Sequence, residues 1–129
     1  MIPITTDEVC VVDDDPSVLR SLAHLLDSDG FAAHTFDTVE EFLVHAGRQA
    51  VTLAVLDVWM PRMSGLELQE QLRAFSPNTR VIIITARDEP AIRDAAMEGG
   101  AFAFLIKPFD DEKFLALVRS VMRPTADLS

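Results

Sequence analysis

The sequence predicts an α/β domain built on a doubly wound parallel sheet of five strands with five flanking helices. Three observations lead to this fold class. The chain has 129 residues, which is the size of one ordinary domain. Apolar runs alternate with amphipathic segments along the chain, which is the pattern of strand–helix–strand units. Four of the apolar runs end in a reactive polar residue, and such residues meet in one crevice when parallel strands lie side by side.

The expected strands are the five apolar runs. The first, third and fourth runs are almost continuous in Val, Ile and Leu, which is typical of central strands buried on both faces. The second run mixes polar and apolar residues and is expected at an edge of the sheet. The expected ranges are 8–13, 31–36, 51–56, 80–85 and 102–106.

The expected helices follow from capping residues and apolar stripes. Asp15 and Pro16 suit the cap and first turn of the first helix, and Gly30 suits its end. Thr38, with Glu41 three residues later, resembles a capping box. The fourth helix has an apolar face made mostly of Ala, so we expect it to pack weakly and to be able to move. The expected ranges are 16–29, 38–47, 64–75, 89–98 and 110–122.

Composition narrows the class of protein. Hydrophobic residues make up 49% of the chain, enough to bury about two-thirds of the unfolded surface. Cys10 is the only cysteine and is expected to be an inert buried thiol. The formal charge of −10 argues against direct nucleic-acid contact by this domain. The cysteine usage, with no signal peptide and no long apolar span, leads us to expect a cytoplasmic protein with no membrane partner.

Carboxylates, a lysine and a hydroxyl group are predicted to converge at the carboxyl edge of the sheet. Asp13 and Asp14 follow the first run, Asp57 the third and Lys107 the fifth, while Thr85 ends the fourth. Carboxylates about 4 Å apart repel by several kcal/mol at an effective dielectric constant near 20. A hard divalent cation relieves this repulsion, so we expect a Mg²⁺ site at Asp13, Asp14 and Asp57.

Asp57 is the expected nucleophile of this site. A carboxylate can attack phosphorus and form an aspartyl phosphate when a metal and a cation neutralise the developing charge. Lys107 supplies a point charge, and Thr85 supplies a hydroxyl donor that could hold phosphoryl oxygens. Taken singly, these two would be a surface lysine and an ordinary strand-end threonine, but their joint placement favours the site. Asp15 is expected to cap a helix instead.

The remaining candidates are expected to have ordinary roles. His24, His34 and His45 match no zinc-binding spacing and are expected to be surface or packing residues. Trp59 is expected at the exposed rim of the crevice. Arg87, in the loop after the fourth run, is either a solvated residue or one that influences the lifetime of a phosphoryl group.

Six motifs occur in order along nearly all of residues 8–122. They are Val11-Val12-Asp13-Asp14, Leu56-Asp57-Val58-Trp59-Met60-Pro61, Ser64-Gly65, Thr85-Ala86, Gly100-Ala101 and Phe104-Leu105-Ile106-Lys107-Pro108-Phe109. An Asp pair or a single Lys-Pro would be weak support, whereas the ordered set is specific. With these motifs the chain resembles the receiver domain of two-component response regulators, most closely receivers that precede LuxR-type helix-turn-helix domains.

The resemblance implies a metal-assisted phosphoacceptor site. Asp57 matches the phosphoacceptor, Asp14 a direct Mg²⁺ ligand and Asp13 the residue that holds a metal-bound water. Trp59 would contribute its backbone carbonyl to the metal.

The resemblance also implies roles for the later motifs and a strand order. Thr85 and Lys107 would bind the phosphoryl group, and the peptide bond before Pro108 would be cis. Phe104 matches an aromatic switch residue. The sheet is expected to be flavodoxin-like, in the order 2-1-3-4-5.

The implied function is phosphoryl acceptance from a sensor histidine kinase. The chain would not be an enzyme beyond its own phosphorylation and dephosphorylation. Phosphorylation would switch the face formed by residues 89–98, 102–106 and 110–122, and so control homodimerisation or an output domain, expected to be transcriptional. Residues 1–123 would form the receiver, with 124–129 a tail or the start of a linker.

Two alternatives remain open at this point. Residues 13–17 could imitate the first motif of a haloacid-dehalogenase-type phosphatase, in which Asp13 would carry the phosphate, although that family needs an acidic pair after a later strand. The second alternative is an interaction module of the same fold that works without phosphorylation. Such modules usually lose the acceptor, an acidic residue or the lysine, and all of these are present here.

Overall fold

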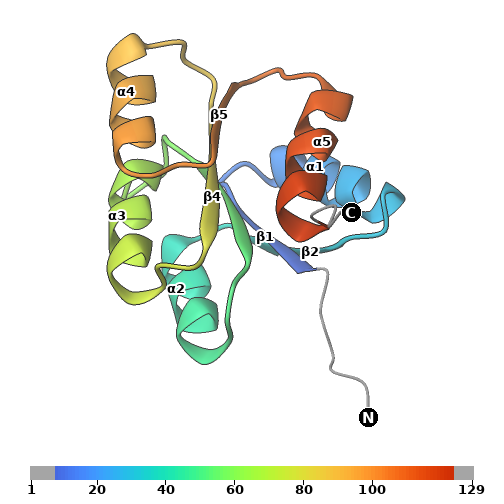
Figure 1. Cartoon of the computed structure of the whole chain (residues 1–129), viewed down its shortest axis with the longest axis horizontal. Helices are drawn as coiled ribbons and strands as arrows, with labels where there is room; N and C mark the ends of the chain where they lie inside the picture. The colour runs from blue at the N-terminus through green and yellow to red at the C-terminus, as the bar shows by residue number, and fades with distance from the viewer. Residues whose placement is uncertain (1–7, 124–129) are drawn as a thin grey trace, which may run out of the picture.

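The computed structural model describes residues 8–123, which form one parallel sheet with helices on both faces (Figure 1). The elements in chain order are β1 (Glu8–Val12), α1 (Pro16–Ser28), β2 (Ala32–Phe36), α2 (Val39–Arg48), β3 (Leu53–Asp57), α3 (Gly65–Phe75), β4 (Arg80–Thr85), α4 (Pro90–Glu98), β5 (Ala103–Ile106) and α5 (Asp111–Met122). All neighbouring strands pair in parallel, in the order β2-β1-β3-β4-β5. The predicted fold class and strand order are therefore confirmed.

The predicted element boundaries differ from the observed ones by one or two residues. The third strand was expected over 51–56, but β3 begins at Leu53 and includes Asp57. The reason is that the ladder to β4 continues to the pair Asp57 and Ile84. β1 ends at Val12, so Asp13 is the first residue beyond it.

The core has two halves, one on each face of the sheet. Helices α2, α3 and α4 cover one face, and α1 and α5 cover the other (Figure 1). Along β1, Cys10 and Val12 join the first half and Val9 and Val11 the second, all almost fully buried. Burial, with repulsion from Glu8, raises the pKa of the Cys10 thiol to about 12. The thiol is therefore protonated and inert, as predicted.

Side-chain caps fix where the helices begin. Thr38 accepts a hydrogen bond from the Glu41 backbone N–H (3.2 Å) at the start of α2. The reciprocal pair of a capping box lies at the start of α3, where Ser64 accepts from the Glu67 N–H (3.1 Å) and the Glu67 carboxylate accepts from the Ser64 N–H (2.9 Å).

Helix α4 packs weakly, as its Ala-rich face predicted. Ala96 is its buried residue, while 46% of Met97 is exposed. A buried hydrogen bond from Gln69 Nε2 to the Ala96 carbonyl (2.9 Å) ties the helix to α3. A helix with so small a buried apolar face is typical of elements that can move.

The edge position predicted for the second strand is also confirmed. β2 pairs only with β1, and its burial is mixed, with Ala32 exposed and Phe36 buried. Within residues 8–123, no helix is both long and apolar enough to cross a membrane.

Candidate functional site

The carboxyl edge of the sheet gathers the polar residues that follow its strands. Asp13 lies directly after β1, Asp57 and Thr85 end β3 and β4, and Lys107 follows β5. Because β1, β3, β4 and β5 are adjacent and parallel, these four residues share one edge. Three of them are buried: Asp13 and Thr85 fully, and Asp57 to all but 5%.

Lys107 bridges two buried carboxylates. Its Nζ donates a hydrogen bond to Asp13 Oδ2 (3.0 Å) and forms an ion pair with Asp57 Oδ1 (3.0 Å). Burial opposes the charge on Lys107, but the hydrogen bonds to Asp13 and Asp57 outweigh it and raise its pKa. The lysine is therefore a permanent cation at neutral pH, placed between the two carboxylates.

The electrostatic balance at Asp57 still disfavours its ionised form. Burial, followed by repulsion from Asp13, raises the pKa of Asp57 to about 6, against the lowering effect of Lys107. One lysine thus fails to compensate the buried negative charge completely. A second cation at this position would stabilise the ionised carboxylate.

A divalent cation fits the residues that are present. Carboxylate oxygens of Asp13, Asp14 and Asp57 lie within 4.8 Å of one another, and Asp14 is exposed, which leaves solvent access. An all-oxygen set with room for water is what Mg²⁺ prefers. Asp15 takes the capping role predicted for it, since Ser17 Oγ and N–H donate to its carboxylate and lower its pKa.

Backbone contacts hold Asp57 in place. The Val58 N–H donates to the Ile84 carbonyl (3.0 Å), and the Gly65 N–H donates to the Val58 carbonyl (2.9 Å). Gly65 approaches so closely that a Cβ there would overlap the carbonyl oxygen of Asp57. Gly65 of the Ser64-Gly65 motif therefore allows the chain to pack closely against the backbone of Asp57.

The other side of the site is held by the ends of β4 and β5. The Thr85 hydroxyl accepts a hydrogen bond from the Arg87 N–H (3.1 Å), and the Lys107 N–H donates to the Thr85 carbonyl (2.7 Å). The peptide bond between Lys107 and Pro108 is cis, as expected.

A cation–aromatic contact lies at the rim of the site. Trp59 is 41% exposed, in line with its expected rim position, and the Arg87 guanidinium lies 4.5 Å from the centre of its ring. This contact was not predicted, because Arg87 was expected either as a solvated loop residue or as one that influences the lifetime of a phosphoryl group. The two residues come from different loops, so no local spacing could reveal it.

The three histidines lie outside this edge. His24 is exposed on α1, as expected of a surface residue. His34 and His45 pack against each other and against Phe36, in agreement with packing roles. Both also face Glu8, a grouping that the sequence did not suggest.

Comparison with known proteins agrees with this geometry. The family model for the response regulator receiver domain matches residues 9–119. The chain is 37% identical to response regulator MprA of Mycobacterium leprae over 117 residues, covering 91% of this chain and 51% of that protein. It is 33% identical to response regulator protein TodT of Pseudomonas putida over 115 residues, covering 89% of this chain and 51% of that protein. The chain thus spans about half the length of these relatives.

Two solved receiver structures superimpose closely. The beryllofluoride-activated NtrC4 receiver domain dimer gives a TM-score of 0.86 at 32% identity, covering 91% of this chain and 97% of that one. The beryllofluoride-activated DrrB receiver domain gives 0.82 at 31% identity, covering 92% and 98%. Taken with the acidic edge and its bridging lysine, these findings show that the chain belongs to the response regulator receiver domain family.

Proposed function

We propose that Asp57 accepts a phosphoryl group from a sensor histidine kinase, with Mg²⁺ held beside it. Receiver domains in general partner with sensor histidine kinases, bind Mg²⁺ in an acidic pocket and are not enzymes in the usual sense. The observation that carries the proposal for this chain is the position of Lys107 Nζ, 3.0 Å from carboxylate oxygens of both Asp13 and Asp57.

In the proposed transfer, a carboxylate oxygen of Asp57 forms the bond to phosphorus. The phosphorus–nitrogen bond of the kinase's phosphohistidine breaks, and its electron pair stays on the imidazole nitrogen, which takes up a proton. Lys107 offsets the negative charge of the phosphoryl oxygens, as a fixed cation does in such sites. The Thr85 hydroxyl accepts from the Arg87 N–H, and its own O–H would donate to another phosphoryl oxygen.

Mg²⁺ would be held by Asp13, Asp14, Asp57 and the backbone carbonyl of Trp59. When bound, it would stabilise the negative charge that develops on the phosphoryl oxygens. The carboxylates of this chain orient it, and Asp14, being exposed, remains accessible to the entering ion. A related response regulator from Burkholderia pseudomallei, 27% identical with a TM-score of 0.79, was solved with a phosphorylated aspartic acid and a calcium ion. The match covers 89% of this chain and 68% of that one.

Labelling with acetyl phosphate and Mg²⁺ tests the assignment. Intact-mass measurement should show one added phosphoryl group on the wild type and on Asp94→Asn, a matched change at an exposed position of α4. Asp57→Asn should gain none. Undiminished labelling of Asp57→Asn would contradict the proposal, and phosphate on Asp13 would instead favour the phosphatase alternative. No labelling of any variant would favour the interaction module.

We extend the proposal to the output face, made of α4, β5 and α5. Drawing the Thr85 hydroxyl inward would empty space beneath α4, and Phe104 could turn inward to fill it. In the present structure Phe104 is partly buried and the Arg93 guanidinium of α4 lies 5.0 Å from its ring centre. An inward turn would break this contact, and α4 is held weakly enough to follow.

The changed face would then serve as a homodimer interface. The beryllofluoride-activated NtrC4 receiver, which is similar to this chain, is a dimer, and this similarity supports the proposed homodimer. Sedimentation with Mg²⁺, with and without beryllofluoride, is expected to show a dimer only with the phosphoryl mimic. A profile that stays monomeric, together with unchanged hydrogen exchange over residues 86–110, would contradict it.

We also propose that the receiver unit is residues 1–123 and that 124–129 form a tail or the start of a linker to a transcriptional output domain. By its resemblance to receivers that precede LuxR-type domains, we propose that this output domain is a LuxR-type helix-turn-helix domain. Residues 124–129 lie outside the described part of the chain. The curated relatives are about twice as long as the matched region, which supports an output domain in the whole protein.

A further inference from the structure

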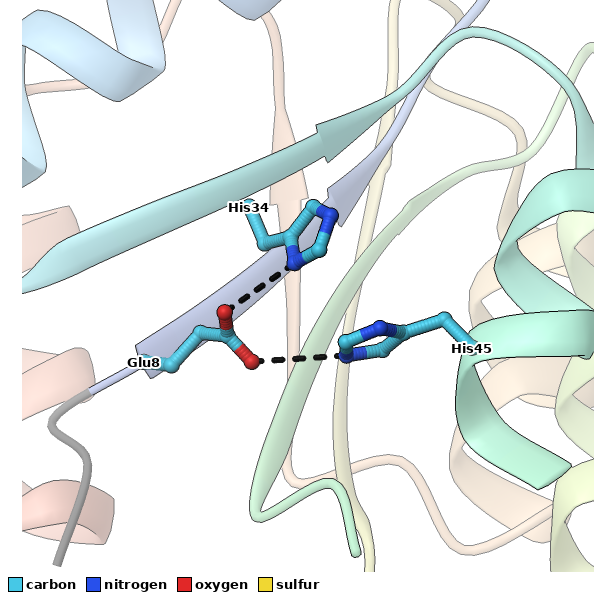
Figure 2. A group of neighbouring side chains, drawn as sticks. All are labelled: Glu8, His34 and His45. Atoms are coloured by element: carbon cyan, nitrogen blue, oxygen red, sulfur yellow. Dashed lines mark hydrogen bonds and ion pairs between the residues drawn. The ribbon is translucent and has the colours of Figure 1, made fainter. Parts of the chain in front are cut away.

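Glu8, His34 and His45 form a cluster at the end of β1 opposite the acidic edge. Glu8 begins β1, His34 lies in the middle of β2 and His45 lies in the last turn of α2. Figure 2 shows both imidazole rings turned toward the Glu8 carboxylate, each facing a different one of its oxygens. The carboxylate and one nitrogen from each ring all lie within 4.8 Å of one another.

The distances suit a tetrahedral metal ion. His34 Nδ1 lies 3.0 Å from Glu8 Oε2, and His45 Nε2 lies 3.3 Å from Glu8 Oε1. Zinc bonds to nitrogen and carboxylate oxygen are about 2.0–2.1 Å long, so the ligand atoms of a tetrahedron lie about 3.3 Å apart. Each imidazole nitrogen thus lies about as far from a Glu8 oxygen as two ligands of such a site lie from each other, and all the ligand atoms are within 4.8 Å of one another.

An unpartnered nitrogen points into the same space. Only 9% of the His45 side chain is exposed, and its Nε2 finds no hydrogen-bond partner among the residues the structure describes. Its 3.3 Å approach to Glu8 is close enough for an ion pair but is not a hydrogen bond. A buried nitrogen without a hydrogen bond is costly, and a metal ion bound to it would remove this cost.

The rings are held in this orientation by packing. His34 stacks on Phe36, with ring centres 4.4 Å apart and planes at 16°. His45 meets the edge of His34 (4.3 Å) and lies 5.2 Å from Phe36. Because these contacts fix both rings, little side-chain freedom would be lost on binding an ion.

We propose that Glu8, His34 and His45 bind a borderline divalent ion of the Zn²⁺ class, which clamps β2 and α2 to β1. Two imidazoles and one carboxylate form a donor set that suits Zn²⁺, whereas Mg²⁺ takes oxygen ligands. The cluster is partly open to solvent, since 42% of the His34 side chain and 26% of the Glu8 side chain are exposed. A water molecule or a donor from another molecule would complete the site.

Binding of Zn²⁺ to the whole chain, measured by competition with a chromogenic chelator, tests the proposal. Excess Mg²⁺ is kept present so that the acidic edge does not take up zinc. The single variants Glu8→Gln, His34→Gln and His45→Gln preserve side-chain size, and His24→Gln, at an exposed position of α1, is the matched control. Loss of second-sphere partners already weakens metal sites by about 10–100-fold, so losing a direct ligand should raise the dissociation constant more than about 100-fold.

Two further readouts distinguish a site from a change in folding. Co²⁺ should give the visible absorption of a tetrahedral complex in the wild type and in His24→Gln, and lose it in the other three variants. Zn²⁺ should raise the melting temperature of the wild type and of His24→Gln, the two proteins expected to bind Co²⁺, and not that of the other three variants. Acetyl-phosphate labelling of Asp57 should continue in every variant. Zinc binding that is absent in the wild type, equal in all variants or weakened as much by His24→Gln would overturn the proposal.

Discussion

Replacing Asp57 by Asn is expected to stabilise the metal-free protein at neutral and alkaline pH. Burial and repulsion from Asp13 raise the pKa of Asp57 from 3.8 to about 6, although Lys107 opposes the change. The folded state therefore holds this proton more tightly than the unfolded state does. This rise in the pKa corresponds to a loss of about 3 kcal/mol in the free energy of unfolding once Asp57 is fully ionised. Asn removes the buried charge and this cost, at the loss of one ion pair with Lys107.

The sign of the pH dependence follows from the raised pKa. The favourable contribution of protonated Asp57 is fully present below about pH 4 and is lost as the pH rises through about 6. The wild type therefore loses stability over this range relative to Asp57→Asn, in which the position does not titrate. The difference in the free energy of unfolding should be close to zero near pH 4 and reach about 2–3 kcal/mol at pH 8.

Urea denaturation followed by circular dichroism, with chelator present, measures this difference. With a slope near 2 kcal/mol per molar urea, the midpoint at pH 8 should rise by about 1 M in Asp57→Asn. Asp94→Asn, on the exposed surface of α4, should match the wild type at both pH values. Added Mg²⁺ should narrow the gap by stabilising the wild type. A variant no more stable than the wild type at pH 8 would mean that the attraction of Lys107 outweighs burial and repulsion.

Three other changes probe the rest of the structure. Gly65→Ala should cost about 2 kcal/mol or more in urea denaturation and reduce phosphate uptake, because its Cβ would overlap the Asp57 carbonyl; unchanged uptake would contradict the close fit. Mg²⁺ at ten times its dissociation constant should stabilise the wild type by about 1.4 kcal/mol and so raise its melting temperature. Asp14→Ala should lose this rise and Asp15→Ala should keep it; an equal rise in both variants would place the ion elsewhere. Gln69→Leu removes the buried hydrogen bond to α4, and should cost about 1–2 kcal/mol and speed hydrogen exchange in α4, while unchanged exchange would show that the tether is unimportant.

The carboxyl edge could be predicted because it depends on topology alone. In a parallel sheet any residue at a strand's carboxyl end lies on the same edge, so Asp57, Thr85 and Lys107 could be grouped from three separate runs. The bridging contact of Lys107 with both Asp13 and Asp57 was not predicted, since it depends on one side-chain rotamer. The limits of β3 were also misjudged, because backbone pairing continues through Asp57 whatever its side chain.

The histidine cluster could not be predicted because it depends on register and helix rotation. Strand alternation can place Glu8 and His34 on one face, but only the pairing of Cys10 with His34 brings them close. His45 reaches them because core packing turns that side of α2 toward the sheet, where Phe42 is fully buried. None of these conditions leaves a spacing pattern in the sequence.

The two cation sites proposed for this chain would select different ions because their donors differ. β1 begins at Glu8 and leads directly into Asp13, so the clusters lie about 17 Å apart along one strand. Three carboxylates at one end favour a hard, hydrated ion, and two imidazoles with one carboxylate at the other favour a borderline one. The Asp13 N–H also donates to the Phe36 carbonyl (3.1 Å), and the ring of Phe36 stacks on His34. Hence β2, which an ion at the histidines would contact through His34, also anchors the first residue of the acidic site through Phe36.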